Sequence, residues 1–349
     1  MPNVAILGAG VMGSAMAMPA AATGADVALI GTHLDTEVVR SVSGNGWHPK
    51  LGVALPEKVK AYEWTEFGAA ISKKPDLIIL GVSSAGVNWA VDRLTESLLA
   101  PIPIMMITKG LATDGEIIEI LPTIVQRELA SRKGLNVPVM AVGGPCIAGE
   151  LAALRDTSII VAGADKEALD RALTHLRAPY YHARQTSDII GVEVCAAFKN
   201  FYAISVGSVA GRLERDGKAS NAALMHNLSS SAFTQALREM RLIVQALGGD
   251  PETVGGLAGA GDLYVTCQAG RNGRMGRLLG LGHPYSKAKS NHMPTDTVEG
   301  ANLALELGAT LERMMVDGRL APAAMPLTRA IIAAICRDDP MVLDFSHFH

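Results

Sequence analysis

The chain has 349 residues, more than one compact core usually holds, so we expect two domains. Hydrophobic residues make up 49% of it, enough for large buried cores, and its 36 glycines suit many tight turns. The formal net charge is −3 and no long basic run occurs, which argues against nucleic acid or an anionic membrane surface as a partner.

The cysteines and the most apolar segment bear on the compartment. The four cysteines are far apart and form no C-x-x-C pair, which fits a reduced, cytoplasmic location. No basic segment followed by an apolar one opens the chain, so we expect no signal peptide. The most apolar stretch, Val192–Val209, contains Glu193, Lys199 and Asn200 and is too polar for a membrane span. We predict a helix buried in protein.

Strand-like and helix-like segments alternate in the first half of the chain, which predicts βαβ units and a mostly parallel sheet. We therefore expect an α/β fold whose first domain, residues 1–186, is of the Rossmann type. The expected strands are Asn3–Leu7, Asp26–Ile30, Asp76–Val82, Ile102–Ile107, Val137–Val142, Ser158–Ala162 and Tyr180–Ala183. The expected helices include Ala85–Leu99, Gly115–Arg132 and Lys166–Leu176.

The pattern changes near Gln185, after which apolar residues recur at helical spacing. This change predicts an all-helical second domain over residues 187–349, interrupted by the glycine-rich loop Gly255–Gly261. Its expected helices are Val192–Val209, Ala219–Gly248, Glu299–Leu307 and Thr328–Cys336.

The first strand leads into a G-x-G-x-x-G motif made by Gly8, Gly10 and Gly13, with a helix expected after it. The first glycine permits a tight turn, the second lets a pyrophosphate approach the backbone, and the third allows close packing of helix and strand. The free N–H groups and the dipole of the helix then favour phosphate. The motif in this context predicts a dinucleotide site.

The end of the second strand, Ile30-Gly31-Thr32-His33, does not choose between NAD and NADP. An acid here would bind the ribose hydroxyls of NAD, whereas an Arg would favour the 2′-phosphate of NADP, and neither is present. Asp35 comes slightly late and is expected to cap a helix that begins at Thr36. Because the acid is missing, the sequence slightly favours NADP, with Thr32 and His33 near the 2′-phosphate; a solvated loop is the alternative.

Two more segments follow strands, where the carboxyl edge of a parallel sheet binds ligands. They are Thr108-Lys109-Gly110 and Gly143–Glu150, the latter with small residues that let backbone N–H groups approach a ligand. A lysine in a surface turn and a plain βα turn are the respective alternatives. Cys146 lacks a nearby His or second Cys, so a structural thiol is the simpler interpretation.

Lys199 lies in the apolar stretch Gly191–Phe201, followed directly by Asn200. Burying an unpaired ammonium is unfavourable, so this lysine should have a partner or lose its proton easily, which suits a proton donor and acceptor. A snorkelling lysine at a helix edge is the alternative. Further on, Asp262 could orient Lys199, and Arg271 with Asn272 forms a donor-rich cluster suited to a phosphate or carboxylate. A flexible, solvated loop is the alternative there.

These motifs together resemble the NAD(P)-dependent glycerol-3-phosphate dehydrogenases along nearly the whole chain. Seven of them occur in the family's order: G-x-G-x-x-G, Thr-Lys-Gly, Gly-Pro-x-x-Ala-x-Glu, Ala-Phe-Lys-Asn, Gly-x-Gly-Asp-Leu, Arg-Asn and Val-Glu-Gly at Val298-Glu299-Gly300. The resemblance implies interconversion of glycerol 3-phosphate and dihydroxyacetone phosphate by hydride transfer with NAD or NADP. It also implies a homodimer, and no His/Cys cluster suggests a metal.

The resemblance implies roles for individual residues. Lys199 would be the general acid and base, with Asp262 beside it and Lys109 as a further catalytic group. The implied substrate contacts are Lys109, Gly144, Cys146, Lys199, Asp262, Gly270, Arg271 and Asn272. The implied cofactor contacts are Gly8, Gly10, Val11, Met12, Gly13, Thr32, His33, Lys109, Ala148, Arg271, Thr297 and Glu299.

Three positions depart from the family pattern, and each removes a polar side chain near the expected substrate. Cys146 replaces the usual Ser or Thr, Gly149 replaces a basic residue, and Gly270 replaces the Ser before the Arg-Asn pair, in a loop shorter by one residue. They keep open a related dehydrogenase for another phosphorylated ketose or a β-hydroxy acid. A dinucleotide sensor without turnover is a further alternative.

Overall fold

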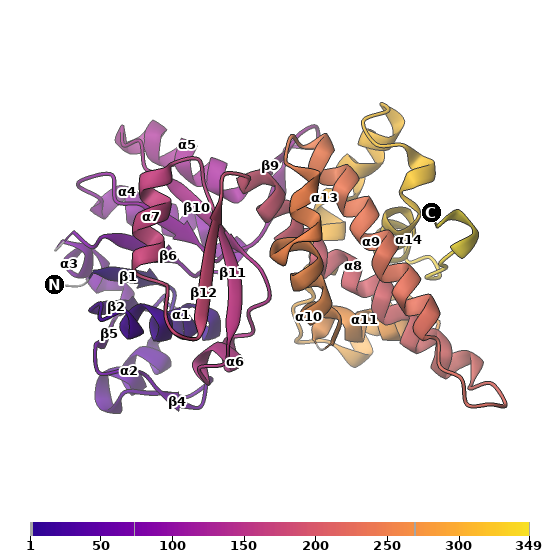
Figure 1. Cartoon of the computed structure of the whole chain (residues 1–349), viewed down its shortest axis with the longest axis horizontal. Coiled ribbons are helices and arrows are strands. Elements are labelled where there is room, and N and C mark those ends of the chain that lie inside the picture. The colour runs from indigo at the N-terminus through magenta and orange to yellow at the C-terminus, as the bar shows by residue number, and fades with distance from the viewer. Residues whose placement is uncertain (1–2, 73, 269, 349) are drawn as a thin grey trace. The chain divides into compact units, whose positions relative to one another are not determined.

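The computed structural model describes residues 3–72, 74–268 and 270–348 (Figure 1). The chain forms two compact units. The sheet unit comprises the chain up to Lys109 together with Leu121–Ile189, and the helical unit comprises Gly110–Ile120 together with the chain from Ile190 onward. The chain therefore passes from one unit to the other three times.

An eight-stranded, mostly parallel sheet is the centre of the sheet unit, as the alternating pattern predicted. Its strand order is β12-β11-β10-β7-β6-β1-β2-β5, and every neighbouring pair is parallel except β10 with β11. The strands are β1 (Val4–Leu7), β2 (Val27–Ile30), β5 (Val59–Tyr62), β6 (Leu77–Leu80), β7 (Ile104–Met106), β10 (Val139–Gly143), β11 (Thr157–Ala162) and β12 (Tyr181–Thr186).

The central strands are apolar at every position because helices cover both faces of a parallel sheet. β1 reads VAIL, β2 reads VALI and β6 reads LIIL, and all their residues are buried. The strand order reverses direction between β1 and β6, which is where ligands bind in open α/β sheets. The helices of this unit are α1 (Val11–Ala22), α2 (Thr36–Asn45), α3 (Phe67–Ile71), α4 (Val87–Ser97), α5 (Leu121–Lys133), α6 (Ala148–Ala152) and α7 (Lys166–Thr174).

The sequence analysis missed β5 and two small antiparallel pairs. These pairs are β3 (Trp47–His48) with β4 (Val53–Ala54), and β8 (Leu111–Thr113) with β9 (Ile118–Ile120). The helix predicted over Gly115–Arg132 is wrong in its first part, since α5 begins only at Leu121. The Asp114 side chain accepts the N–H groups of Glu116 and Ile117, both at 2.9 Å, which turns the chain back on itself instead.

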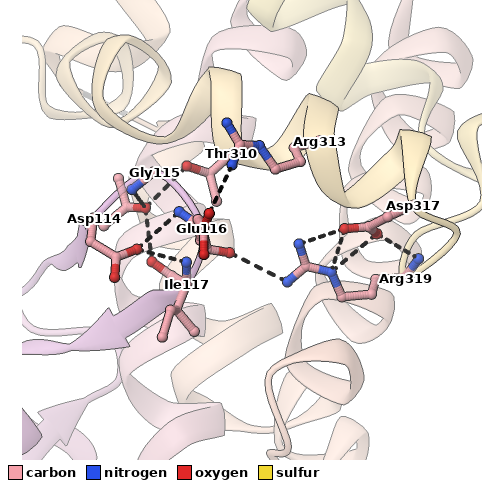
Figure 2. Close-up of polar contacts among 9 residues, drawn as sticks. Asp114, Gly115, Glu116, Ile117, Thr310, Arg313, Asp317 and Arg319 are labelled. Atoms are coloured by element: carbon pink, nitrogen blue, oxygen red, sulfur yellow. Dashed lines mark hydrogen bonds and ion pairs between the residues drawn. The ribbon is translucent and has the colours of Figure 1, made fainter.

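The β8–β9 hairpin is held by α13 (Glu299–Val316) within the helical unit, as Figure 2 shows. The hydroxyl oxygens of Thr113 and Thr310 are 3.0 Å apart, and Arg319 donates a hydrogen bond of 3.5 Å to the carbonyl of Glu116. The Glu116 carboxylate lies 3.7 Å from the guanidinium of Arg313. These contacts explain why a segment interrupting the first half of the chain packs with the second half.

The helical unit is built around α8 (Ile189–Asp216), the buried helix that the sequence predicted. By length and composition α8 could cross a membrane, but 83% of its most apolar window is buried inside the fold, as in the core helix of a globular unit. The other helices are α9 (His226–Ala246), α10 (Asp262–Gln268), α11 (Arg271–Gly280), α12 (Tyr285–Lys287), α13 and α14 (Pro326–Cys336). Of these, α10, α11 and α12 were not predicted, and the helix predicted from Ala219 begins only at His226.

A buried carboxylate ties α9 to the first turn of α14. Glu239 accepts the backbone N–H groups of Leu327 and Thr328, at 2.8 and 2.7 Å, and the Thr328 hydroxyl at 2.7 Å. It thereby satisfies N–H groups that a helix N-terminus leaves without intrahelical partners. Burial nevertheless raises the pKa of Glu239 to about 7, because the charged form is separated from water.

This shift makes the stability of the protein depend on pH in a defined window. With a raised folded-state pKa, unfolding releases a proton between pH 4.5, the carboxyl's ordinary pKa, and about 7. The contribution of Glu239 to the free energy of unfolding should therefore fall by about 3 kcal/mol as pH rises through this window. Glu239→Gln has no such proton, so the difference between wild type and variant in urea unfolding isolates the effect. We expect the free energy of unfolding of wild type, minus that of the variant, to fall between pH 4.5 and about 7. If this difference stays constant or rises over that range, the effect is contradicted.

Candidate functional site

Steric contacts explain two of the three glycines in the loop after β1. Gly8 has φ +113°, and a Cβ on it would lie 2.7 Å from the carbonyl carbon and oxygen of Gly81, which follows β6. A Cβ on Gly13 would lie 2.1 Å from the Gly8 oxygen. Real Cβ atoms do not approach so closely, so the turn, the end of β6 and the first turn of α1 pack together only with glycine.

Gly10 differs from its neighbours because a Cβ there would meet no atom within 4 Å. It is the N-cap of α1, so the first N–H groups of that helix, including those of Val11 and Met12, lack intrahelical partners. Open space beside free N–H groups at the positive end of a helix fits a pyrophosphate. The loop thus has the form that a dinucleotide requires.

The loop after β2 corrects the expected role of Asp35. Asp35 occupies the N-cap position of α2, but its side chain makes no capping bond. It accepts instead the N–H and the hydroxyl of Thr32, at 2.9 and 2.8 Å, and the N–H of Ala9 at 3.3 Å. The Thr32 hydroxyl proton is therefore directed at Asp35. His33 is exposed, with its ring edge-on to Trp89 of α4 at a centroid distance of 6.0 Å.

The other predicted residues of the sheet unit also follow strands. Thr108 donates its hydroxyl to the carbonyl of Val82 at 2.7 Å, which fixes the chain directly before Lys109 against the end of β6. Gly144 follows β10 with φ +115°, and Ala148 is the first residue of α6. The Cys146 side chain packs against the core beside the Tyr181 hydroxyl, in line with a structural thiol.

In the helical unit, Lys199 of α8 forms an ion pair with Asp262, the first residue of α10. Asp262 is 1% exposed and Lys199 9% exposed, so both charges are buried. Removing one partner of such a pair leaves an uncompensated buried charge and costs about 3–5 kcal/mol. The carboxylate was the partner that the sequence analysis expected for this lysine.

Asn272 links three helices beside this pair. Its Nδ2 donates to Oδ1 of Asn200 at 2.9 Å, and its Oδ1 accepts the N–H of Gly300 at 2.9 Å. The side chain thus uses its oxygen and one of its two N–H groups to join α8, α11 and the start of α13. The second N–H is the part of this amide that a substrate could use.

Arg271 and Glu299 form an ion pair between the first residues of α11 and α13. Both side chains are about half exposed, so a ligand can reach them. Gly270 is the N-cap of α11, with φ +127°, a conformation that favours glycine. Unpaired helical N–H groups and a guanidinium therefore occur together at this helix end, which suits a phosphate. Thr297 lies two residues before Glu299.

Glycines let the α8 and α11 backbones touch, and the sequence analysis missed this signal. A Cβ on Gly276 would lie 2.0 Å from the Ile204 carbonyl oxygen, and one on Gly280 would lie 2.0 Å from that of Ser208. On the facing side, a Cβ on Gly211 would lie 1.9 Å from the Arg277 oxygen. The spacing of four residues between Gly276 and Gly280 could have indicated such a contact. It sets the position of Arg271 and Asn272 against α8.

Gly276→Ala should therefore destabilise the protein, because the added methyl group forces the two backbones apart. We expect a loss of about 3 kcal/mol in the free energy of unfolding, the upper part of the range for overpacking. Gly273→Ala is the matched control in the same helix, since a Cβ there meets nothing within 4 Å. Thermal unfolding of both variants tests the contact, and equal melting temperatures for the two would contradict it.

The structure groups the predicted residues by unit. Lys199, Asp262, Arg271, Asn272 and Glu299 form one connected set in the helical unit, which also contains Gly270 and Thr297. The remaining predicted site residues belong to the sheet unit. The sequence analysis missed the part that Asn200 takes in this set. Within residues 3–72, 74–268 and 270–348, no group of three or more His, Cys, Asp or Glu side chains could hold a metal ion.

Comparisons with known proteins agree with this arrangement. A family model described as NAD-dependent glycerol-3-phosphate dehydrogenase N-terminus matches residues 3–169, and its C-terminal counterpart matches residues 188–342. The two matched segments correspond to the two halves in which the two sets of residues lie.

Individual relatives cover most of the chain. An NADP(+)-dependent glycerol-3-phosphate dehydrogenase of Archaeoglobus fulgidus is 34% identical over 285 residues, 82% of each chain. A glycerol-3-phosphate dehydrogenase [NAD(P)+] of Desulfitobacterium hafniense is 30% identical over 320 residues, 90% of this chain and 84% of the relative. The crystal structure of the Coxiella burnetii glycerol-3-phosphate dehydrogenase has a TM-score of 0.76 and 27% identity, over 97% of this chain and 95% of that one.

Proposed function

The chain belongs to the NAD-dependent glycerol-3-phosphate dehydrogenase family of oxidoreductases, and on that premise we propose that it interconverts glycerol 3-phosphate and dihydroxyacetone phosphate. The observation that carries the proposal is the buried Lys199–Asp262 pair, which adjoins the polar bridge from Asn200 to the first turn of α11. Burying these two charges between α8 and α10 is unfavourable because both are removed from water, so we expect them to have a function. Proton transfer at the substrate oxygen supplies one.

The proposed chemistry needs a hydride and a proton. The nicotinamide, when bound, supplies the hydride to C2 of the ketone. As the C2 oxygen gains negative charge, the Lys199 ammonium donates one of its protons to it, giving the alcohol and a neutral amine. In the reverse direction the neutral amine accepts the hydroxyl proton. Asp262 orients the Lys199 side chain in both directions.

The phosphate group of the substrate has a separate place in this proposal. Arg271 and the N–H groups at the start of α11, from Gly270 on, bind it, and the free N–H of Asn272 adds a further donor. The resemblance assigns other substrate contacts to Lys109, Gly144 and Cys146. None of these contacts requires a side chain at Gly149 or Gly270, so the departures from the family pattern leave the phosphate contacts in place.

The cofactor is a nicotinamide dinucleotide held by the loop Gly8–Gly13, with NADP favoured. No Arg or free acid follows β2, and the exposed His33 is the side chain that could meet a 2′-phosphate. Thr32 suits this role less, because its hydroxyl proton is donated to Asp35. The archaeal relative that is named NADP(+)-dependent agrees with this preference. The family resemblance assigns further contacts to Ala148, Thr297 and Glu299.

Initial rates with dihydroxyacetone phosphate and either NADPH or NADH test the cofactor and the substrate together. We expect turnover with both cofactors, with the higher kcat/KM for NADPH. Unphosphorylated dihydroxyacetone should lower kcat/KM by at least about 100-fold, because the charge-assisted contacts of Arg271 are lost. A higher kcat/KM with an unphosphorylated hydroxy acid would contradict the role of Arg271 and favour the related dehydrogenase.

Lys199→Arg tests proton transfer while keeping the buried positive charge. Arginine retains the ion pair with Asp262 but does not give up its proton near neutral pH. We expect kcat to fall by about 10²–10⁴-fold, the usual contribution of a general acid, with NADPH binding little changed. Fluorescence titration with NADPH is the control. A variant that keeps wild-type kcat would rule Lys199 out as the acid.

We also propose that the enzyme is a cytoplasmic homodimer. The absence of a C-x-x-C pair among its four cysteines supports a reduced compartment. Sedimentation at several concentrations measures the oligomeric state directly.

A further inference from the structure

Ala9, between the first two glycines of the loop, has both of its backbone polar groups bound by buried side chains from later in the sheet unit. Its N–H donates to Oδ2 of Asp35 at 3.3 Å. Its carbonyl oxygen lies 3.4 Å from Nε2 of His48 and also accepts the Ser14 hydroxyl at 3.1 Å. Ala9, Ser14 and His48 are fully buried, and Asp35 is 8% exposed. Buried side chains thus hold the loop in place through the backbone of Ala9.

Asp35 connects the glycine loop to the chain after β2. One carboxylate oxygen, Oδ2, accepts from Ala9 and from both donors of Thr32. A Cβ on Gly31 would lie 3.3 Å from Cβ of Asp35, so glycine lets this turn pack closely against Asp35. Asp35 is therefore directed at the loop, although it is the acid nearest to the end of the second strand.

His48 is held in one orientation by its other ring nitrogen. The N–H of Leu51 donates to Nδ1 at 3.0 Å, so in the neutral ring the proton lies on Nε2, which faces the Ala9 carbonyl. Burial lowers the pKa of His48, which keeps the ring neutral near pH 7. The charged neighbours that act on it are Lys50 on its own connection and Asp35 across the loop.

We propose that Asp35 and His48 are positioning residues that fix the Ala9 peptide groups, and that they thereby hold the phosphate-binding loop in its binding conformation. The Ala9 N–H is then occupied, and the free N–H groups for the pyrophosphate begin at Gly10. Asp35 serves the loop and does not recognise the ribose hydroxyls, so its presence does not favour NAD over NADP. This inference rests on the proposed binding of a nicotinamide dinucleotide.

Asp35 variants separate loop positioning from ribose recognition. Asp35→Ala removes the acceptor, and we expect the Kd values of NADPH and NADH to rise together, by about tenfold, as the loss of one or two hydrogen bonds implies. Asp35→Asn can present its oxygen to the same donors, so both Kd values should stay within about threefold of wild type. Fluorescence titration of the full chain with each cofactor gives these values. A selective loss of NADH affinity in either variant, or no change in Asp35→Ala, overturns the proposal.

His48 provides an independent test if Asp35→Ala does not fold. Glutamine can place an N–H close to the position of Nε2, whereas leucine cannot donate at all. We expect His48→Leu to raise the KM for NADPH about tenfold, with kcat and the KM for dihydroxyacetone phosphate within twofold of wild type, and His48→Gln to restore most of the loss. A fall in kcat with unchanged cofactor KM, or no rescue by glutamine, overturns the positioning role.

Different results would contradict the proposed function and the positioning role of Asp35 and His48. If the wild-type chain binds neither NADPH nor NADH, the proposed function fails. If wild type binds them and both Asp35→Ala and His48→Leu, folded by circular dichroism, bind equally well, only the positioning proposal fails.

Discussion

A buried ammonium in an apolar helix must be neutralised by a carboxylate, and the candidate site of the helical unit depends on this constraint. Lys199 lies in α8, whose residues are mostly apolar and buried, and Asp262 at the start of α10 supplies the opposite charge. Asp262 can occupy this place because the glycine-rich turns before α10 pack tightly: a Cβ on Gly259 would lie 2.1 Å from the Val254 oxygen. The chemistry therefore depends on backbone packing that only glycine allows.

The same principle appears in the sheet unit, where the absence of side chains creates the binding surface. Gly8 and Gly13 let a loop, a strand end and a helix approach each other closely, while Gly10 faces open space. Both sites thus contain two kinds of glycine. At some glycines a Cβ would clash with neighbouring backbone, and at others it would lie in open space. The distinction matters because both kinds of glycine look identical in the sequence.

Several polar residues near the two sites form hydrogen bonds within the protein, which limits the groups that they can offer to a ligand. Asn272 bridges helices, Thr32 donates to Asp35, and Asp35 faces the loop behind Gly10. Residues of this kind hold the groups that bind ligands in the required geometry. For Asn272 both functions are compatible, since one N–H of its amide is not used in the bridge. For Asp35 the inward contacts explain why an acid close to the second strand does not imply a preference for NAD.

The sequence by itself determined the class of fold, the glycine loop and the lysine with its carboxylate, because these follow from local periodicity and from residue types with few alternatives. It predicted seven of the eight strands of the main sheet and the buried helix around Lys199 with good boundaries. The elements it missed include β5, the β8–β9 hairpin and α11, since each is short or glycine-rich and gains its stability from contacts with distant segments. Only the tertiary structure decided that Asp35 and His48 bind Ala9 and that α8 and α11 touch through glycines, because such contacts depend on chain segments 26 to about 70 residues apart.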